Sequence, residues 1–107
     1  MNAIEQREIY AKSNFEVMTE LGARFRAYRI ALGLSQKEVA EQCGTTNMTV
    51  SRFECGKAGS IRLSTFLGLL RALKLLENAY ATIPNLLESP SEIYERREKQ
   101  RRRAPRK

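Results

Sequence analysis

The sequence predicts an all-α fold. Apolar residues recur every three or four positions along several segments, which is the spacing of one helix face. Side chains that cap helix N-termini precede these segments, and glycine or proline follows them. No segment carries a strand signal. We therefore expect five helices around one small core, followed by a basic C-terminal helix or tail.

The first long helix is expected between Ser13 and Gly33. Ser13 and Glu16 form a capping box, and Gly33 is a stop signal. Residues 1–12 hold isolated apolar side chains among charges, so an extra helix and a flexible arm both remain open there. The predicted buried face of the long helix follows the i, i+4, i+7 pattern. It consists of Leu21, Phe25, Tyr28 and Leu32.

Two shorter helices are predicted on either side of Gly44. Ser35 and Glu38 form a second capping box before an inward face that includes Ala40. Gly44 suits the left-handed conformation at a helix end, and Gly56 has the same position after the next helix. The inward residues of the two helices are Val39, Ala40, Cys43, Val50 and Phe53. Thr45 or Thr46 can cap the second of them, and its outward face offers Asn47, Met48, Thr49, Ser51 and Arg52.

Two more helices and a linker follow. A helix is expected at about 63–74 and a short one at about 76–82, which stops before Pro84. The apolar stripe of the first is predicted to be Leu63, Phe66, Leu67, Leu70 and Leu73. Residues 84–90 resemble a linker, and the sequence Ser89-Pro90-Ser91-Glu92 is a start signal for a last helix.

The positive charge is concentrated at the C-terminal end. Residues 1–95 contain eleven basic and eleven acidic side chains, whereas residues 96–107 contain eight basic residues and only Glu98 as an acid. Because like charges repel and large apolar side chains are lacking, this block cannot fold on itself. We interpret it as an interaction tail for a polyanion. Its candidate contacts to phosphates or to a partner protein are Arg96, Arg97, Lys99, Arg101, Arg102 and Arg103.

The composition argues against an enzyme. The chain has no His, Asp or Trp, and Cys43 and Cys55 lack companions for a zinc site. We expect both cysteines to be small, buried or half-buried residues in a reducing compartment, and we expect no metal or cofactor. No apolar run approaches the roughly 20 residues of a membrane span, and no secretory pattern opens the chain. A cytoplasmic, nucleoid-associated protein without membrane contact is the expectation.

Residues 34–57 resemble the helix-turn-helix of a large repressor family, the XRE type, which includes the lambdoid phage repressors, Cro and many bacterial antitoxins. The positions that match the family pattern are Leu34, Ser35, Gln36, Val39, Ala40, Gly44, Val50, Glu54, Gly56 and Lys57. The alternative is an ordinary pair of bundle helices, which would have no reason to expose Asn, Thr and Arg together. The resemblance implies a five-helix, lambda-repressor-like DNA-binding domain over residues 15–83, between an N-terminal arm or short helix (1–14) and a basic C-terminal segment (84–107).

The resemblance also implies roles for individual residues. Because the N-terminal end of the second motif helix enters the major groove in such proteins, the expected base-reading residues are Thr46, Asn47, Met48, Thr49 and Arg52. The expected contacts to the DNA backbone are Ser35, Gln36, Lys37, Thr45, Ser51 and Lys57. In the family, the glutamine of the motif typically holds a phosphate or supports a reading side chain. Arg29 and Glu54 are expected to form a structural ion pair, as the equivalent residues of the family commonly do.

A homodimeric repressor on double-stranded DNA is the function we expect, bound to a palindromic operator and regulating its own operon. Dimer contacts are predicted for Leu75, Leu76, Tyr80, Ile83, Leu86 and Leu87, unless these residues merely close the core. The arrangement after residue 60 is similar to that of HipB-like antitoxins, whose partner is a HipA-like kinase toxin. Two alternatives stay open: a free-standing repressor, and a protein-interaction module whose helix-turn-helix does not bind DNA.

Overall fold

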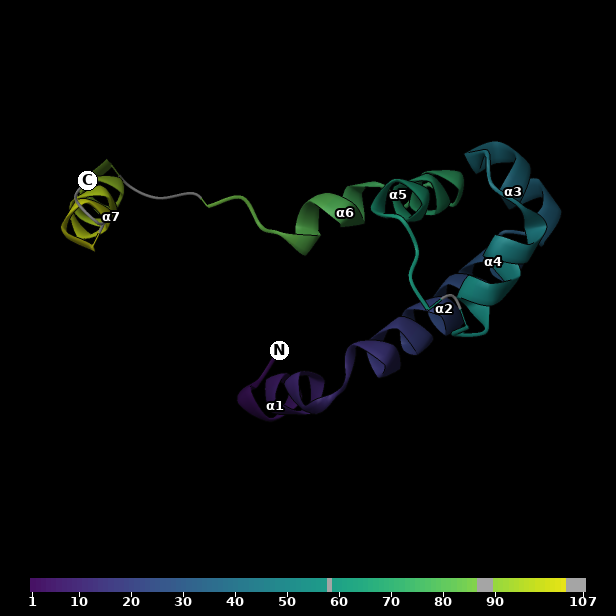
Figure 1. Ribbon diagram of the computed structural model, residues 1–107, viewed down its shortest axis with the longest axis horizontal. Helices are drawn as coiled ribbons and strands as arrows, with labels where there is room; N and C mark the ends of the chain where they lie inside the picture. Colours follow the sequence, from purple (N-terminus) through teal and green to yellow (C-terminus); the bar gives the residue numbers. More distant parts are fainter. Residues whose placement is uncertain (58, 87–89, 104–107) are drawn as a thin grey trace.

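The computed structural model describes residues 1–57, 59–86 and 90–103, and the regular elements in these ranges are all helices (Figure 1). They are α1 (Ala3–Ala11), α2 (Asn14–Ala31), α3 (Gln36–Cys43), α4 (Asn47–Glu54), α5 (Leu63–Ala72), α6 (Glu77–Thr82) and α7 (Pro90–Arg103). The predicted all-α fold is therefore confirmed. Among the described residues, no helix is long and apolar enough to cross a membrane.

The helix boundaries follow from local hydrogen bonds at the predicted caps. The Ser13 hydroxyl accepts from the backbone N–H of Glu16 at 3.1 Å. The Ser35 hydroxyl accepts from the N–H of Glu38 at 3.0 Å, and the Glu38 carboxylate accepts in turn from the N–H of Ser35 at 3.1 Å. Gly44 closes α3 with a φ of 69°. These caps satisfy backbone groups that a helix end leaves free, so the sequence signals and the observed ends agree.

Among the described residues, seven buried apolar side chains from α2 to α5 and the turn after α5 form the core. α3 packs against both α4 and α5, and α2 packs against α4. The ring of Phe53 lies at the centre, edge-on to Phe25 at 5.3 Å and to Phe66 at 6.0 Å between ring centroids, which is a favourable geometry for aromatic rings. The buried apolar residues are Phe25, Val39, Ala40, Val50, Phe53, Leu69 and Leu73.

The predicted buried face of α2 is wrong except for Phe25. Leu21, Tyr28 and Leu32 are 39%, 49% and 49% exposed, and the buried residues of the helix are Gly22, Phe25 and Arg29. The reason is the close approach of two helices. A Cβ atom on Gly22 would lie only 2.0 Å from the carbonyl oxygen of Phe53. The contact with α4 therefore forms on the side of α2 that carries the glycine, and the apolar stripe lies beside it.

The predicted stripe of α5 is right for Leu73, which is buried, and for Phe66, which packs against the core, but it is wrong for Leu63. Leu63 is 72% exposed, whereas Leu69, which the pattern left out, is fully buried together with Leu73. Leucines lie all round this helix, so several stripes fit the sequence, and the packing on α3 selects one of them. Gly68 takes part in that packing, because a Cβ there would lie 3.1 Å from the Cβ of Cys43. Cys43 is half-buried as expected, but Cys55 is exposed.

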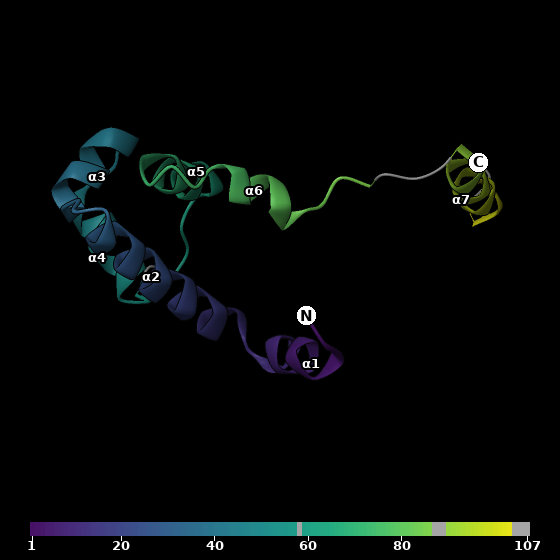
Figure 2. The ribbon, with the colours of Figure 1, turned by 180° about the vertical axis from the view of Figure 1, so that it is seen from behind.

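The two ends of the chain extend away from this core (Figures 1 and 2). Residues 3–11 form helix α1, which has no buried residue. Lys12, directly after α1, forms an ion pair with Glu20 of α2 at 2.6 Å. α7 lies apart from α2–α5 in both views. It continues to Arg103, so the first part of the basic block is helical. The predicted cap Ser89 lies outside the described residues.

Candidate nucleic-acid interface

The outer face of α4 carries polar and flexible side chains that take no part in the fold. Asn47 and Arg52 are exposed, and Met48 is 61% exposed. Within the described ranges, the side chains of Asn47 and Arg52 form no hydrogen bond or ion pair. These side chains therefore lie on the outward face that the sequence predicts, and their role in binding stays a prediction.

The first turn of α4 is held by its own threonines. The Thr46 hydroxyl accepts from the backbone N–H of Thr49 at 3.1 Å and lies 2.9 Å from the Thr49 hydroxyl. Of the two caps left open by the sequence, Thr46 is thus the one in use. Because these hydroxyls bond to each other, they stabilise the helix end from which Asn47 and Met48 project.

An open groove lies between the start of α3 and the outer face of α4. It has a volume of about 610 Å³, and its lining residues are Gln36, Asn47, Met48, Ser51 and Arg52. Four of these five come from α4, and the fifth is the first residue of α3. The two helices of the motif therefore contribute to one surface.

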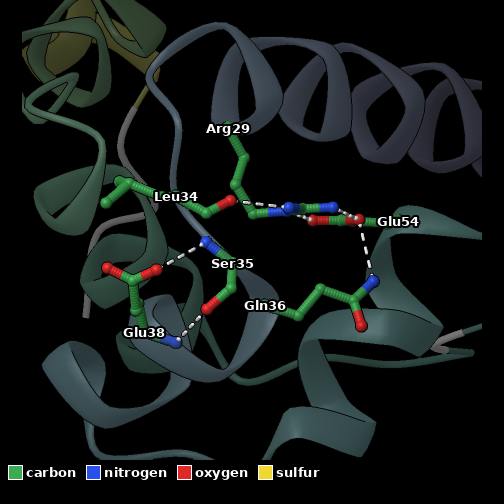
Figure 3. Close-up of polar contacts among 6 residues, drawn as sticks. All are labelled: Arg29, Leu34, Ser35, Gln36, Glu38 and Glu54. Atoms are coloured by element: carbon green, nitrogen blue, oxygen red, sulfur yellow. Dashed lines mark hydrogen bonds and ion pairs between the residues drawn. The ribbon is translucent and has the colours of Figure 1, made fainter.

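A buried ion pair lies beneath that surface (Figure 3). The Arg29 side chain donates to both carboxylate oxygens of Glu54, from Nε at 2.6 Å and from Nη2 at 2.9 Å. Its Nη1 donates to the carbonyl oxygen of Leu34 at 2.7 Å. The hydrogen bond to Glu54 raises the pKa of Arg29 above its ordinary value, although burial acts in the opposite direction. Arg29 and Glu54 are 8% and 5% exposed, so the pair stabilises the junction of α2, α3 and α4 from inside.

One more donor joins this network. Nε2 of Gln36 donates to Oε1 of Glu54 at 3.0 Å. This bond has no signal in the sequence, because the two residues are eighteen positions apart and only the packing of α3 on α4 brings them together. The structural importance of Gly22 was missed for the same reason, since a helical glycine reveals its neighbour only in the fold.

The other predicted contact residues, within the motif and on α7, are exposed to different degrees. Ser35, Lys37 and Lys57 are exposed, whereas Thr45 and Ser51 are half-buried. On α7, the exposed basic residues are Arg96, Arg97, Lys99 and Arg101, and Arg101 pairs with Glu98. The side chains of Arg102 and Arg103 lie outside the described residues. The structure does not bring α7 to the groove, because α7 and α4 lie at opposite ends of the molecule (Figure 1).

Two capped helices joined through Gly44, with an outward face free of internal partners, define a helix-turn-helix domain. The family described as "Helix-turn-helix domain" matches the chain over residues 20–81, which is more than half of its length. The chain belongs to this family, in agreement with the repressor-type regulators that residues 34–57 resemble. A search of curated proteins finds no match.

Proposed function

We propose that this protein is a sequence-specific DNA-binding repressor that inserts α4 into the major groove. The observation that carries this proposal is the outer face of α4, where Asn47, Met48 and Arg52 are exposed without internal partners. An asparagine amide can bond to adenine and an arginine to guanine, and a methionine can contact the methyl group of thymine. Thr46 and Thr49 complete the base-reading set. Their hydroxyls already bond to each other, so we expect contacts through their methyl groups.

Contacts to the sugar–phosphate backbone would fix the position of the domain on the duplex. The first backbone N–H groups of α3 and α4 are natural phosphate donors, because the N-terminus of a helix attracts anions. The side chains that we propose for the same purpose are Ser35, Lys37, Thr45, Ser51 and Lys57.

We further propose that the protein acts as a homodimer. Tyr80, Ile83 and Leu86 are 81%, 83% and 62% exposed, so they do not close the core of the monomer. Leu75 packs against the core and Leu76 is half-buried, while Leu87 lies outside the described residues. A dimer would place two copies of α4 about 34 Å apart on a palindrome, which supplies more sequence information than one domain can read.

The test uses the full-length protein and a pool of randomised duplexes. We expect selection of a palindromic sequence, and sedimentation should show two protein chains on each bound duplex. The double variant Asn47→Ala/Arg52→Ala should lose at least about 30-fold in affinity, because each bidentate contact contributes about 1–3 kcal/mol. Arg7→Ala/Asn85→Ala removes the same side-chain types at exposed positions outside the groove and should bind like the original protein. Unchanged binding by the first pair would overturn base reading by α4.

The basic helix α7 has two proposed partners. Its exposed cations can follow phosphates beside the operator, or they can bind a HipA-like kinase, as the resemblance implies. Removal of residues 96–107 separates the two, because each lost phosphate contact lowers the slope of log affinity against log salt by about 0.9. A shallower slope supports the phosphate contacts, whereas an unchanged slope with loss of co-purifying kinase supports an antitoxin.

A further inference from the structure

Gln36 belongs both to the buried network and to the DNA-facing groove. It is the first residue of α3 and is half-buried. Its Nε2 donates to Oε1 of Glu54 at 3.0 Å, and the same oxygen accepts from Nη2 of Arg29 at 2.9 Å. The side chain also lines the groove next to Asn47 and Arg52. A single amide therefore connects the interior of the domain with its outer surface.

The chemistry of Glu54 determines which end of this amide faces inward. The carboxylate of Glu54 accepts from Nε and Nη2 of Arg29 and is therefore ionised. An ionised carboxylate can only accept hydrogen bonds. The carbonyl oxygen of Gln36 would be repelled at that position, whereas its NH₂ group is attracted. The orientation of a glutamine amide is normally ambiguous and has to be inferred from its partners. Here the partner leaves one choice.

The hydrogen bond from Nε2 of Gln36 to Glu54 points away from the carbonyl oxygen of the same amide (Figure 3). A planar amide carries two N–H bonds, one trans and one cis to its oxygen. The bond to Glu54 uses the trans N–H, so the oxygen and the cis N–H remain together on the free edge. In the described part of the chain, this edge has no hydrogen-bond partner. One acceptor beside one donor is the pattern with which glutamine bonds to N6 and N7 of adenine.

We propose that Gln36 reads an adenine edge in the major groove and that Glu54 is the positioning residue that orients it. This inference rests on the proposed DNA binding and replaces the phosphate contact that the resemblance implied for Gln36. A phosphate oxygen could accept only the cis N–H and would repel the neighbouring carbonyl oxygen. An adenine satisfies both groups, so the free edge of Gln36 fits a base better than a phosphate.

The test measures base preference separately from total affinity. Full-length protein is used with the duplex that the original protein selects from the randomised pool, and with every single-base variant of that duplex. Gln36→Met keeps the length of the side chain and removes the amide. We expect the preference for adenine at one position of each half-site to fall about 5- to 150-fold, with an unchanged salt dependence. Gln42→Met, an exposed change on the same helix outside the groove, is the control and should alter nothing.

Two other results would overturn the proposal. An equal loss on all duplexes with a shallower salt dependence would show a phosphate contact, and an unchanged preference would show a purely structural side chain. If the original protein selects no sequence at all, the proposed DNA binding fails, and this inference fails with it. A phosphate contact or a purely structural side chain would leave the proposed DNA binding intact. A failure of the inference about Gln36 can therefore be distinguished from a failure of the proposed function.

The orienting action of Glu54 has a test that needs no DNA. In the NMR spectrum of the free full-length protein, one side-chain amide proton of Gln36 should exchange with water more slowly than the other, because only one is bonded to Glu54. Gln42 is exposed, so the difference between its two protons should be no larger than the small intrinsic one of a free amide. Glu54→Gln replaces the carboxylate with a neutral, weaker acceptor, so it should reduce the difference at Gln36 and weaken the same base preference that Gln36→Met removes. Equal exchange of both Gln36 protons in the original protein would refute the proposed orientation.

Discussion

Replacing Gly22 with alanine tests whether the close crossing of α2 and α4 holds the domain together. A Cβ atom at this position would lie 2.0 Å from the carbonyl oxygen of Phe53 and 3.0 Å from its carbonyl carbon. Both atoms belong to the backbone of α4, so no side chain can rotate away to make room. The two helices would have to separate by more than an ångström to reach an ordinary contact of 3.4 Å.

The expected size of this effect is the difference between two opposing contributions. Helix propensity alone favours alanine over glycine by about 1 kcal/mol. Overpacking a core contact costs about 1–3 kcal/mol, occasionally more, and a backbone clash should lie at or above the upper end of that range. We therefore expect Gly22→Ala to lower the free energy of unfolding by about 2 kcal/mol, measured by urea denaturation of the full-length protein.

The control for this experiment is Ala27→Gly. Ala27 is exposed on the same helix, so its replacement measures propensity alone and should cost about 1 kcal/mol. Helix propensity alone would make Gly22→Ala raise the free energy of unfolding, whereas the backbone clash should make it lower that free energy. The comparison of the two variants therefore tests the direction of the change as well as its size. If Gly22→Ala were as stable as the original protein, or more stable, the reasoning about the helix crossing would be refuted.

Three further predictions concern stability and charge. Glu54→Ala leaves Arg29 buried without its carboxylate and should cost about 3–5 kcal/mol in urea denaturation; a change below 1 kcal/mol would rule out a structural ion pair. Lys74 has a φ of 62°, so Lys74→Gly should stabilise the protein by about 1 kcal/mol, whereas Lys74→Ala should not. The hydrogen bond from Lys12 lowers the pKa of Glu20 below the ordinary value of a glutamate. The stabilising contribution of this pair is therefore present above that ordinary pKa and is lost as the pH falls through the lowered pKa. In a carboxyl NMR titration, Lys12→Met should move the pKa of Glu20 upward, and an unmoved value would exclude the pair.

The helix-turn-helix could be predicted because its signals are local. Ser35 and Glu38 bond to each other across three residues, and Gly44 and Gly56 adopt the left-handed conformation that follows a helix. Each of these contacts depends only on neighbours along the chain. The exposure of Asn47 and Arg52 then follows from the helical period, since the opposite face of α4 is apolar.

The packing between helices could not be predicted in the same way. In α5, leucines occupy more than one face, so the sequence did not distinguish Leu69, which is buried, from Leu63, which is exposed. On α2, the glycine that permits the crossing has no apolar side chain and lay outside the predicted stripe. The bond from Gln36 to Glu54 joins two helices and has no pattern in either of them. These features depend on which faces meet, and a local period does not contain that information.

The network around Glu54 separates the proposed reading residues into two groups. Asn47 and Arg52 have no internal partner among the described residues, so they can be exchanged without disturbing the fold, and a change of operator preference through them should leave stability within about 0.5 kcal/mol. Gln36 donates to a carboxylate that also holds Arg29. A change there alters the groove and also removes a hydrogen bond to a buried carboxylate, and a hydrogen bond to a charged group contributes about 1.5–3 kcal/mol. Variants with a new DNA preference should therefore arise more readily on α4 than at the start of α3.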